Sequence, residues 1–280
     1  SGKISEIYNN CGDDDCRQDF LYNVTPVWTA GIVRFLKKAF DEGNEDIKKA
    51  VRSRWKEVRR QVPAIAAREL KDKDPLVRAE AAWALGAIAV PLPPDITDIA
   101  YSFLQFGIRL VYGSMGIFPP SGVEKTEDIA AMLGEAMSDP DPRVRANAAE
   151  AAGRVYNSAV AGFLSGLLGD KDAEVRRQAV IALGHIAYAP AIPRMAALLK
   201  EPDPLMRKAA AAALGEISNK RAARYLNAAL LDKNYDVYLA ALAAFATLNS
   251  QLGAAKYLGS LSLGDDIRGF LYQQPDGKQT

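Results

Sequence analysis

The chain contains an internal sequence repeat that recurs every 31 residues, and few folds are compatible with such a repeat. Copies of one pattern begin at Asp141, Asp172, Asp203 and Asn234, at a constant interval. An earlier copy begins at Asp74, and its separation from Asp141 is 67, which is one period plus 36. Self-similarity at such a period indicates stacked helical units. We therefore predict a helical array with an insertion between its first two clear copies.

Each copy has the features of a helix. The pair Asp-Pro opens three of them, because Asp accepts hydrogen bonds from the first amides and Pro fits the first helical position. In the first copy the apolar stripe is Val77, Ala81, Ala82, Leu85 and Ile88. A shorter helix precedes each copy, with stripes such as Ala64, Ala67 and Leu70, or Ala196, Leu198 and Leu199. One such pair cannot bury its apolar face alone, so pairs must stack.

These repeats resemble the HEAT-repeat family in its short bacterial form, which also occurs in phycobilisome-lyase-type repeats. The resemblance covers roughly residues 60–90 and 125–250. It implies an all-α fold, an α-solenoid of HEAT-like helix pairs. It implies little about function beyond a binding surface.

An arginine recurs at the same place in the first four copies, as Arg78, Arg145, Arg176 and Arg207. We predict an Asp–Arg ladder that ties neighbouring repeats together. The alternative is a row of anion-binding side chains.

We predict a single domain over residues 1–280. Its parts are an N-terminal cap (1–60), a first clear repeat (61–90), a hydrophobic insertion (91–123), repeats of period 31 (124–250) and a C-terminal cap and tail (251–280).

The insertion contains the least typical segment, an inserted hydrophobic helix expected over residues 96–112. Its polar residues Asp98, Ser102, Gln105 and Arg109 form one narrow stripe, and most of the remaining surface is apolar. The uncharged stretch between Asp98 and Arg109 is short, whereas a membrane span needs about twenty apolar residues. Exposing one large apolar side chain costs roughly 1.5–3 kcal/mol, so something must cover the second apolar face.

Three alternatives could cover this second apolar face. They are the solenoid groove itself, a protein or membrane partner, or an apolar ligand such as a lipid or a sterol-like molecule. For the ligand we predict a binding site formed by side chains of the insertion. They are Tyr101, Phe103, Leu104, Gln105, Phe106, Ile108, Arg109, Tyr112 and Met115.

Cys11 and Cys16, the only cysteines, flank a polar loop near the start of the chain. We predict a disulfide between them and therefore an exported, periplasmic protein whose targeting segment has been removed. Asp13, Asp14 and Asp15 lie between the cysteines. We expect a solvated acidic loop there, with a calcium site as the alternative.

Residues 46–60 form a basic amphipathic helix with Ile47, Val51, Trp55 and Val58 on one face. We expect a solvated outer face with Trp55 in the core. Peripheral contact with an anionic membrane or groove is the alternative.

The composition excludes several functions. The 35 basic and 34 acidic residues nearly cancel, so nucleic-acid binding is not indicated. His185 is the only histidine, and the His-Glu pairs of HEAT-type di-iron hydroxylases are missing from the sequence. We therefore predict a protein that is not an enzyme and holds neither cofactor nor metal. The first hypothesis is an envelope protein that carries an apolar ligand, with a role in lipid transport. The alternative is a protein-interaction scaffold without a small-molecule ligand.

Overall fold

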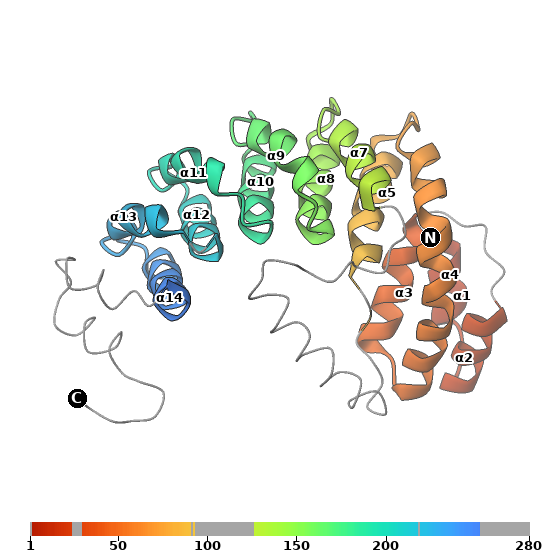
Figure 1. The fold of residues 1–280 in the computed structure, drawn as a ribbon. Coiled ribbons are helices and arrows are strands. Elements are labelled where there is room, and N and C mark those ends of the chain that lie inside the picture. Colours follow the sequence, from red (N-terminus) through yellow and green to blue (C-terminus); the bar gives the residue numbers. More distant parts are fainter. Residues whose placement is uncertain (1, 24–29, 91, 93–125, 218, 253–280) are drawn as a thin grey trace, which may run out of the picture. The chain divides into compact units, whose positions relative to one another are not determined.

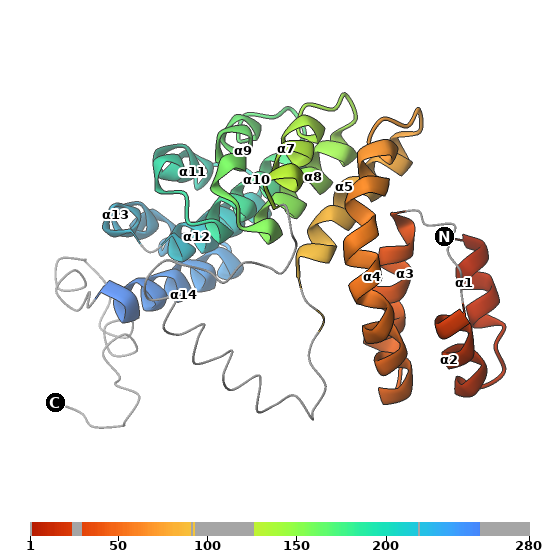
Figure 2. The same ribbon diagram turned by 45° about the vertical axis from the view of Figure 1, so that its right-hand side comes forward.

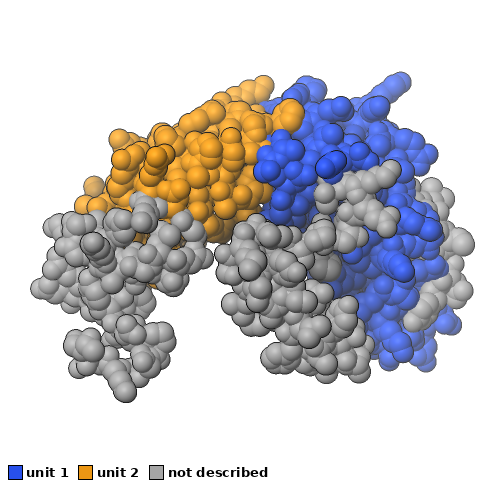
Figure 3. Space-filling model, viewed as in Figure 1, with its two compact units in different colours: residues 1–160 blue, residues 161–280 orange. Residues whose placement is uncertain are grey.

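The computed structural model describes residues 2–23, 30–90, 92, 126–217 and 219–252, and within these ranges every regular element is a helix. The chain divides into two compact units, residues 1–160 and 161–280 (Figure 3). Each unit is described by itself. The all-α prediction is confirmed. The predicted helix at 96–112 and the C-terminal cap lie outside the described residues.

Unit 1 contains a short N-terminal helical hairpin followed by longer helices (Figure 1). Its helices are α1 (Gly2–Asn9), α2 (Asp14–Asn23), α3 (Gly31–Glu42), α4 (Glu45–Glu69), α5 (Pro75–Ala89), α7 (Thr126–Ala136), α8 (Pro142–Val155) and the 3₁₀ turn η2 (Ser158–Val160). Helix α5 packs against α3 on one side and α8 on the other, so these three helices form a row.

Unit 2 has two rows of helices, α9, α11 and α13 in one and α10, α12 and α14 in the other (Figures 1 and 2). Its elements are α9 (Ala161–Leu167), α10 (Ala173–His185), η3 (Ala189–Ala191), α11 (Ile192–Leu198), α12 (Pro204–Glu216), α13 (Lys220–Ala229) and α14 (Tyr235–Leu252). Each repeat thus contributes one helix to each row, as the HEAT resemblance implies.

The predicted helix starts are confirmed. The side chains of Asp74, Asp141, Asp172 and Asp203 each accept a hydrogen bond from the amide two residues later, at 2.8–2.9 Å. Asn234 does the same for α14. These bonds satisfy amides that the helix itself leaves without partners.

A buried glycine near the end of each of the first four copies sets the spacing of the row. A Cβ placed on Gly184 would lie 2.8 Å from the Cα of Ala213, and one on Gly215 would lie 2.6 Å from the Cα of Ala244. Real side chains do not approach so closely, so each glycine lets the next helix pack directly on its backbone. In both pairs the sequence separation of glycine and alanine is 29.

The same contact occurs across the predicted insertion. A Cβ on Gly86 would lie 2.4 Å from the Cα of Ala151, and the sequence separation of these two residues is 65. This separation is 36 residues longer than the 29 found in the other two pairs. The first and second copies are also 36 residues further apart than one period. Helix α5 therefore stacks on α8 as one repeat stacks on the next, and the row continues across the insertion.

The arginine ladder is also present. Arg207 donates from Nε and Nη2 to the two carboxylate oxygens of Asp232 in the next repeat, at 2.6 and 2.9 Å. Its Nη1 donates to the carbonyl oxygens of Glu201 and Pro202, at 2.9 and 2.8 Å. The guanidinium thereby joins the loop before its own helix to the following repeat.

Arg78 makes the same set of bonds across the insertion, with Asp139 as its carboxylate partner at 2.7 and 3.0 Å. Like Arg78 and Arg207, Arg145 and Arg176 donate to the carbonyl oxygens six and five residues before them. The prediction of a structural ladder is thus confirmed for Arg78 and Arg207. All four arginines have structural partners, which disfavours an anion-binding row.

Two details of the sequence-based prediction are wrong. Helix α4 runs without a break from Glu45 to Glu69, through Pro63, where we expected one helix to end near Arg60 and another to follow. In this second part, Ala64 is exposed, while the buried positions are Val62, Ile65 and Ala66.

Replacing Gly215 by alanine should destabilise the protein by about 1–3 kcal/mol, because the new methyl group overlaps the backbone of Ala244. Gly162 in α9 is the matched control, since a Cβ there meets nothing within 4 Å. Gly162→Ala should be neutral or stabilising by up to about 1 kcal/mol. Urea unfolding measures both, and equal effects would contradict the packing role of Gly215.

The Asp232→Asn variant should lose about 1–3 kcal/mol of stability at neutral pH, because Arg207 loses a charged partner. The hydrogen bonds from Arg207 lower the pKa of Asp232 below 3.8, and those from Arg143 lower the pKa of Asp141 to about 2. A lowered pKa means that stabilisation is complete above about pH 4 and is lost as the pH falls through the folded-state pKa values. Denaturation curves from pH 7 to pH 2 should show the wild-type advantage over Asp232→Asn shrinking in acid. A constant difference would rule out the charged pair as its source.

Candidate functional site

The predicted ligand-binding residues of the insertion all lie outside the described residues. These are Tyr101, Phe103, Leu104, Gln105, Phe106, Ile108, Arg109, Tyr112 and Met115. The apolar-ligand site therefore stays a prediction from the sequence. The candidate site described below is built from other residues.

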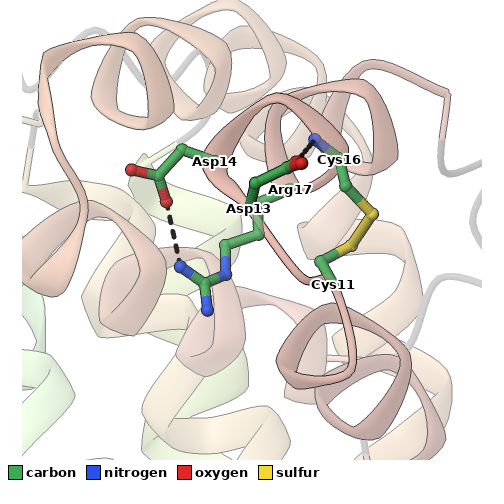
Figure 4. Close-up of a disulfide and its surroundings, with 5 residues drawn as sticks. All are labelled: Cys11, Asp13, Asp14, Cys16 and Arg17. Atoms are coloured by element: carbon green, nitrogen blue, oxygen red, sulfur yellow. Dashed lines mark hydrogen bonds and ion pairs between the residues drawn. A yellow bond between two sulfur atoms is a disulfide. The ribbon is translucent and has the colours of Figure 1, made fainter.

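The predicted disulfide between Cys11 and Cys16 is formed (Figure 4). It joins the end of α1 to the first turn of α2. Tyr8 on α1 also packs edge-on against Phe35 of α3, with ring centroids 5.2 Å apart. The hairpin of α1 and α2 is thus fastened both within itself and to α3.

Two of the three aspartates between the cysteines act in local structure. Asp13 accepts a hydrogen bond from the amide of Cys16 at 2.8 Å and thereby caps α2, and Asp14 pairs with Arg17 at 2.9 Å (Figure 4). Across the part of the chain that the structure describes, no group of acidic, histidine or cysteine side chains is arranged to hold a metal ion. The hydrogen bonds of Asp13 and Asp14 are those expected of a solvated acidic loop.

An aromatic and charged cluster lies on the row of α3, α5 and α8 in unit 1. We call it the Trp83 cluster, and it consists of Arg34, Glu80, Trp83, Glu150 and Arg154. The Arg34 guanidinium lies 4.0 Å from the centre of the Trp83 ring and that of Arg154 lies 5.9 Å from it. At these distances a cation is attracted to the face of the indole. Three helices thus contribute side chains to one group.

Carboxylates hold both arginines in place. Arg34 donates from Nε and Nη2 to the two oxygens of Glu80, at 2.7 and 3.1 Å. Arg154 pairs with Glu150 one turn earlier on α8. A two-point pair fixes the guanidinium plane, so the arrangement exists before any partner arrives. Trp83 stays half-buried and Arg34 keeps 53% of its side chain exposed.

This cluster has the chemistry of recognition. It offers one indole, two guanidinium groups and two carboxylates, each cation already matched with an anion. These groups do not form a nucleophile with a base to activate it. A partly exposed aromatic ring flanked by arginines is typical of the residues that contribute most to protein–protein binding.

Sequence reasoning missed the cluster, although a signal was present. Trp83 occupies the tenth position of the repeat, where the other copies have Glu150, Ile181, Ala212 and Ala243. A single aromatic residue at a position that faces outward in the other repeats marks a departure from the pattern. Arg34 could not have been connected to it, because α3 lies outside the recognisable copies.

His185 is exposed at the position after the buried glycine of its repeat. Its Nε2 is 3.8 Å from a carboxylate oxygen of Glu216 on the next helix. Burial raises the pKa of Glu216, and the neighbouring His185 partly opposes this. Both side chains are more than a third exposed, so the pair is a surface contact.

The last described repeat has an exposed apolar end. Leu231 is 85% exposed and Tyr235 is 69% exposed, with Leu239 on the same helix as Tyr235. Tyr238, which stacks against Tyr235 with centroids 6.1 Å apart, stands where Arg207 stands one repeat earlier. The arginine ladder therefore ends at α14, and tyrosine and leucine side chains take its place.

The basic helix predicted at 46–60 is part of α4. Ile47, Val51, Trp55 and Val58 are all buried, as expected for a helix that covers the core. Within the described ranges, no helix has both the length and the hydropathy needed to cross a membrane.

Comparisons with known proteins agree with this architecture. One family model, described as HEAT repeats, matches residues 160–246, and another, described as HEAT repeat, matches residues 62–90. The comparison with curated proteins found no match.

Three solved structures illustrate the fold similarity. One is the complex of CpcE and CpcF of phycocyanin lyase from Nostoc sp. PCC7120, at 21% identity and TM-score 0.50, covering 75% of this chain and 74% of that one. An engineered protein is 19% identical with TM-score 0.51, covering 89% and 97%. The structure of RanGDP with Kap95p is 15% identical with TM-score 0.51, covering 87% of this chain and 32% of that one. At these identities the similarity concerns the fold alone.

Removing the disulfide with the double variant Cys11→Ser/Cys16→Ser should lower the stability of unit 1 by about 2 kcal/mol, because the closed loop is short. A reductant should destabilise the wild type by a similar amount. Thermal unfolding followed by tryptophan fluorescence measures both, because all three tryptophans of the sequence belong to unit 1. The reductant should leave the stability of the double variant unchanged. An equal loss of stability in both proteins would show that the Cys11–Cys16 disulfide is not the source of the stabilisation.

Proposed function

We propose that this protein, whose chain carries HEAT repeats, is a non-enzymatic scaffold that binds another protein through the Trp83 cluster. The observation that carries the proposal is the preformed group of one indole between two ion-paired arginines on a single row of helices. Its residue types are those that dominate binding energy at protein interfaces.

The fold supports the same function. A row of helices in fixed register presents side chains from several repeats to one partner. The structures of CpcE with CpcF and of Kap95p with RanGDP, both similar in fold, are complexes between proteins. We extend only the general mode, a repeat protein that holds a protein partner, to this chain.

Export is part of the proposal. A bonded pair of cysteines persists in oxidising compartments, and the Cys11–Cys16 bond supports a periplasmic or other envelope location. Fractionation of cells that make the protein from its complete gene tests this directly.

Trp83→Ala should weaken binding of the partner by about thirtyfold, the effect of losing a residue worth about 2 kcal/mol. The full chain serves as bait in an extract of its native cells, and the captured protein is then purified for affinity measurements. Phe163→Ala is the matched control, because Phe163 is a half-exposed aromatic residue outside the cluster. Unchanged affinity for Trp83→Ala, or equal losses for both variants, would overturn the proposal.

A second function follows from the sequence of the insertion, whose expected helix at 96–112 is apolar over most of its circumference. In that case the protein carries a lipid or sterol-like ligand against the groove. Organic extraction of the purified protein followed by mass spectrometry tests it. An empty extract together with no binding to a broad lipid panel would remove this candidate.

A further inference from the structure

Helix α4 concentrates positive charge on one flank. The α4 basic flank consists of Lys48, Lys49, Arg52, Lys56, Arg59 and Arg60. At about 3.6 residues per turn these six side chains fall within an arc of about 120° and extend over about 18 Å of the helix. The whole chain carries a net charge of only +1, so this flank is a local exception.

The packing of α4 determines which groups face solvent. Another side of the helix, with Val51, Trp55 and Val58, is buried in unit 1. Lys49, Lys56 and Arg60 are exposed, and Arg60 has 78% of its side chain in solvent. These three cations lie about 10.5 Å and about 6 Å apart along the helix axis.

Two carboxylates of α4 itself lie beside the flank. Glu45 pairs with Lys48 at 3.1 Å and lies 3.9 Å from Arg52, and Glu57 lies 4.0 Å from Arg60. Lys48, Arg52, Lys56 and Arg60 follow one another at intervals of four, a spacing at which like charges repel. A partner with carboxylates along this line would relieve the repulsion.

We propose that the α4 basic flank is a docking surface for an acidic segment of a partner protein. A membrane fits less well, because an interfacial helix needs an apolar face to insert and that face of α4 is in the core. Single-stranded nucleic acid fits less well, because Phe40, whose ring lies under Arg52, and Trp55 on the same helix are buried and offer no surface for base stacking. Carboxylates spaced along a polypeptide match a straight row of lysines and arginines.

This surface is separate from the Trp83 cluster, which lies on the row of α3, α5 and α8, and neither proposal depends on the other. The test uses the full chain and fluorescent poly-L-glutamate as the acidic probe, with binding followed by anisotropy at low and at physiological salt. Wild type should bind, and more weakly as salt rises. The triple variant Lys49→Glu/Lys56→Glu/Arg60→Glu should bind roughly tenfold less tightly or not at all.

The matched control is Lys171→Glu/Lys200→Glu/Lys233→Glu, which makes the same change in net charge at exposed positions of unit 2. It should keep most of the affinity, as should Trp83→Ala. Equal losses in both triple variants would overturn the proposal, because net charge would then explain the binding. Failure of the wild type to bind poly-L-glutamate would also overturn it, including the case in which vesicles of phosphatidylglycerol and phosphatidylcholine bind instead.

A stability measurement separates lost docking from lost folding. Lys56→Glu creates opposite-charge pairs with Arg52 and Arg60 at intervals of four, so it should leave the melting temperature unchanged or raise it slightly. Its affinity for poly-L-glutamate should nevertheless fall. A variant that bound less and also melted earlier would count against docking at this flank.

Discussion

The direct contact of a glycine on one helix with an alanine on the next determines much of this structure. At Gly184 and Gly215 a side chain would overlap the following helix, which is why a hydrogen atom is needed there. The contact brings α10, α12 and α14 into van der Waals contact along their backbones. Helix spacing, buried alanines and the register of every surface residue in the row depend on it.

The arginine–aspartate pairs that recur along the repeats depend on this register. Because α5 and α12 start at the same place in their repeats, Arg207 reaches Asp232 and Arg78 reaches Asp139 with nearly the same distances. The two pairs nevertheless have sequence separations of 25 and 61. The stack therefore continues across the insertion, and the insertion is free to differ in composition from the repeats.

Fixed register also explains how binding surfaces arise here. The same outward position carries Trp83 in one repeat and Ala212 or Ala243 in others, so local chemistry varies while the frame stays constant. The Trp83 cluster, the apolar end at Tyr235 and the α4 basic flank are three such departures from the repeat. The three surfaces differ in chemistry, from an aromatic ring between arginines to a row of cations, and each therefore suits a different kind of partner.

Sequence patterns were enough to predict the helical repeats, their caps, the ladder arginines and the Cys11–Cys16 pair, because each depends on residues at fixed and short spacing. They also predicted the length of the insertion, which the contact between Gly86 and Ala151 matches. The residues that meet across helices were found from the packing alone. Arg34 reaches Glu80 and Trp83 because α3 packs on α5, and α4 turns its basic flank outward because Trp55 is held in the core. Such contacts join positions far apart in the chain, and local sequence patterns do not encode which distant partners packing will bring together.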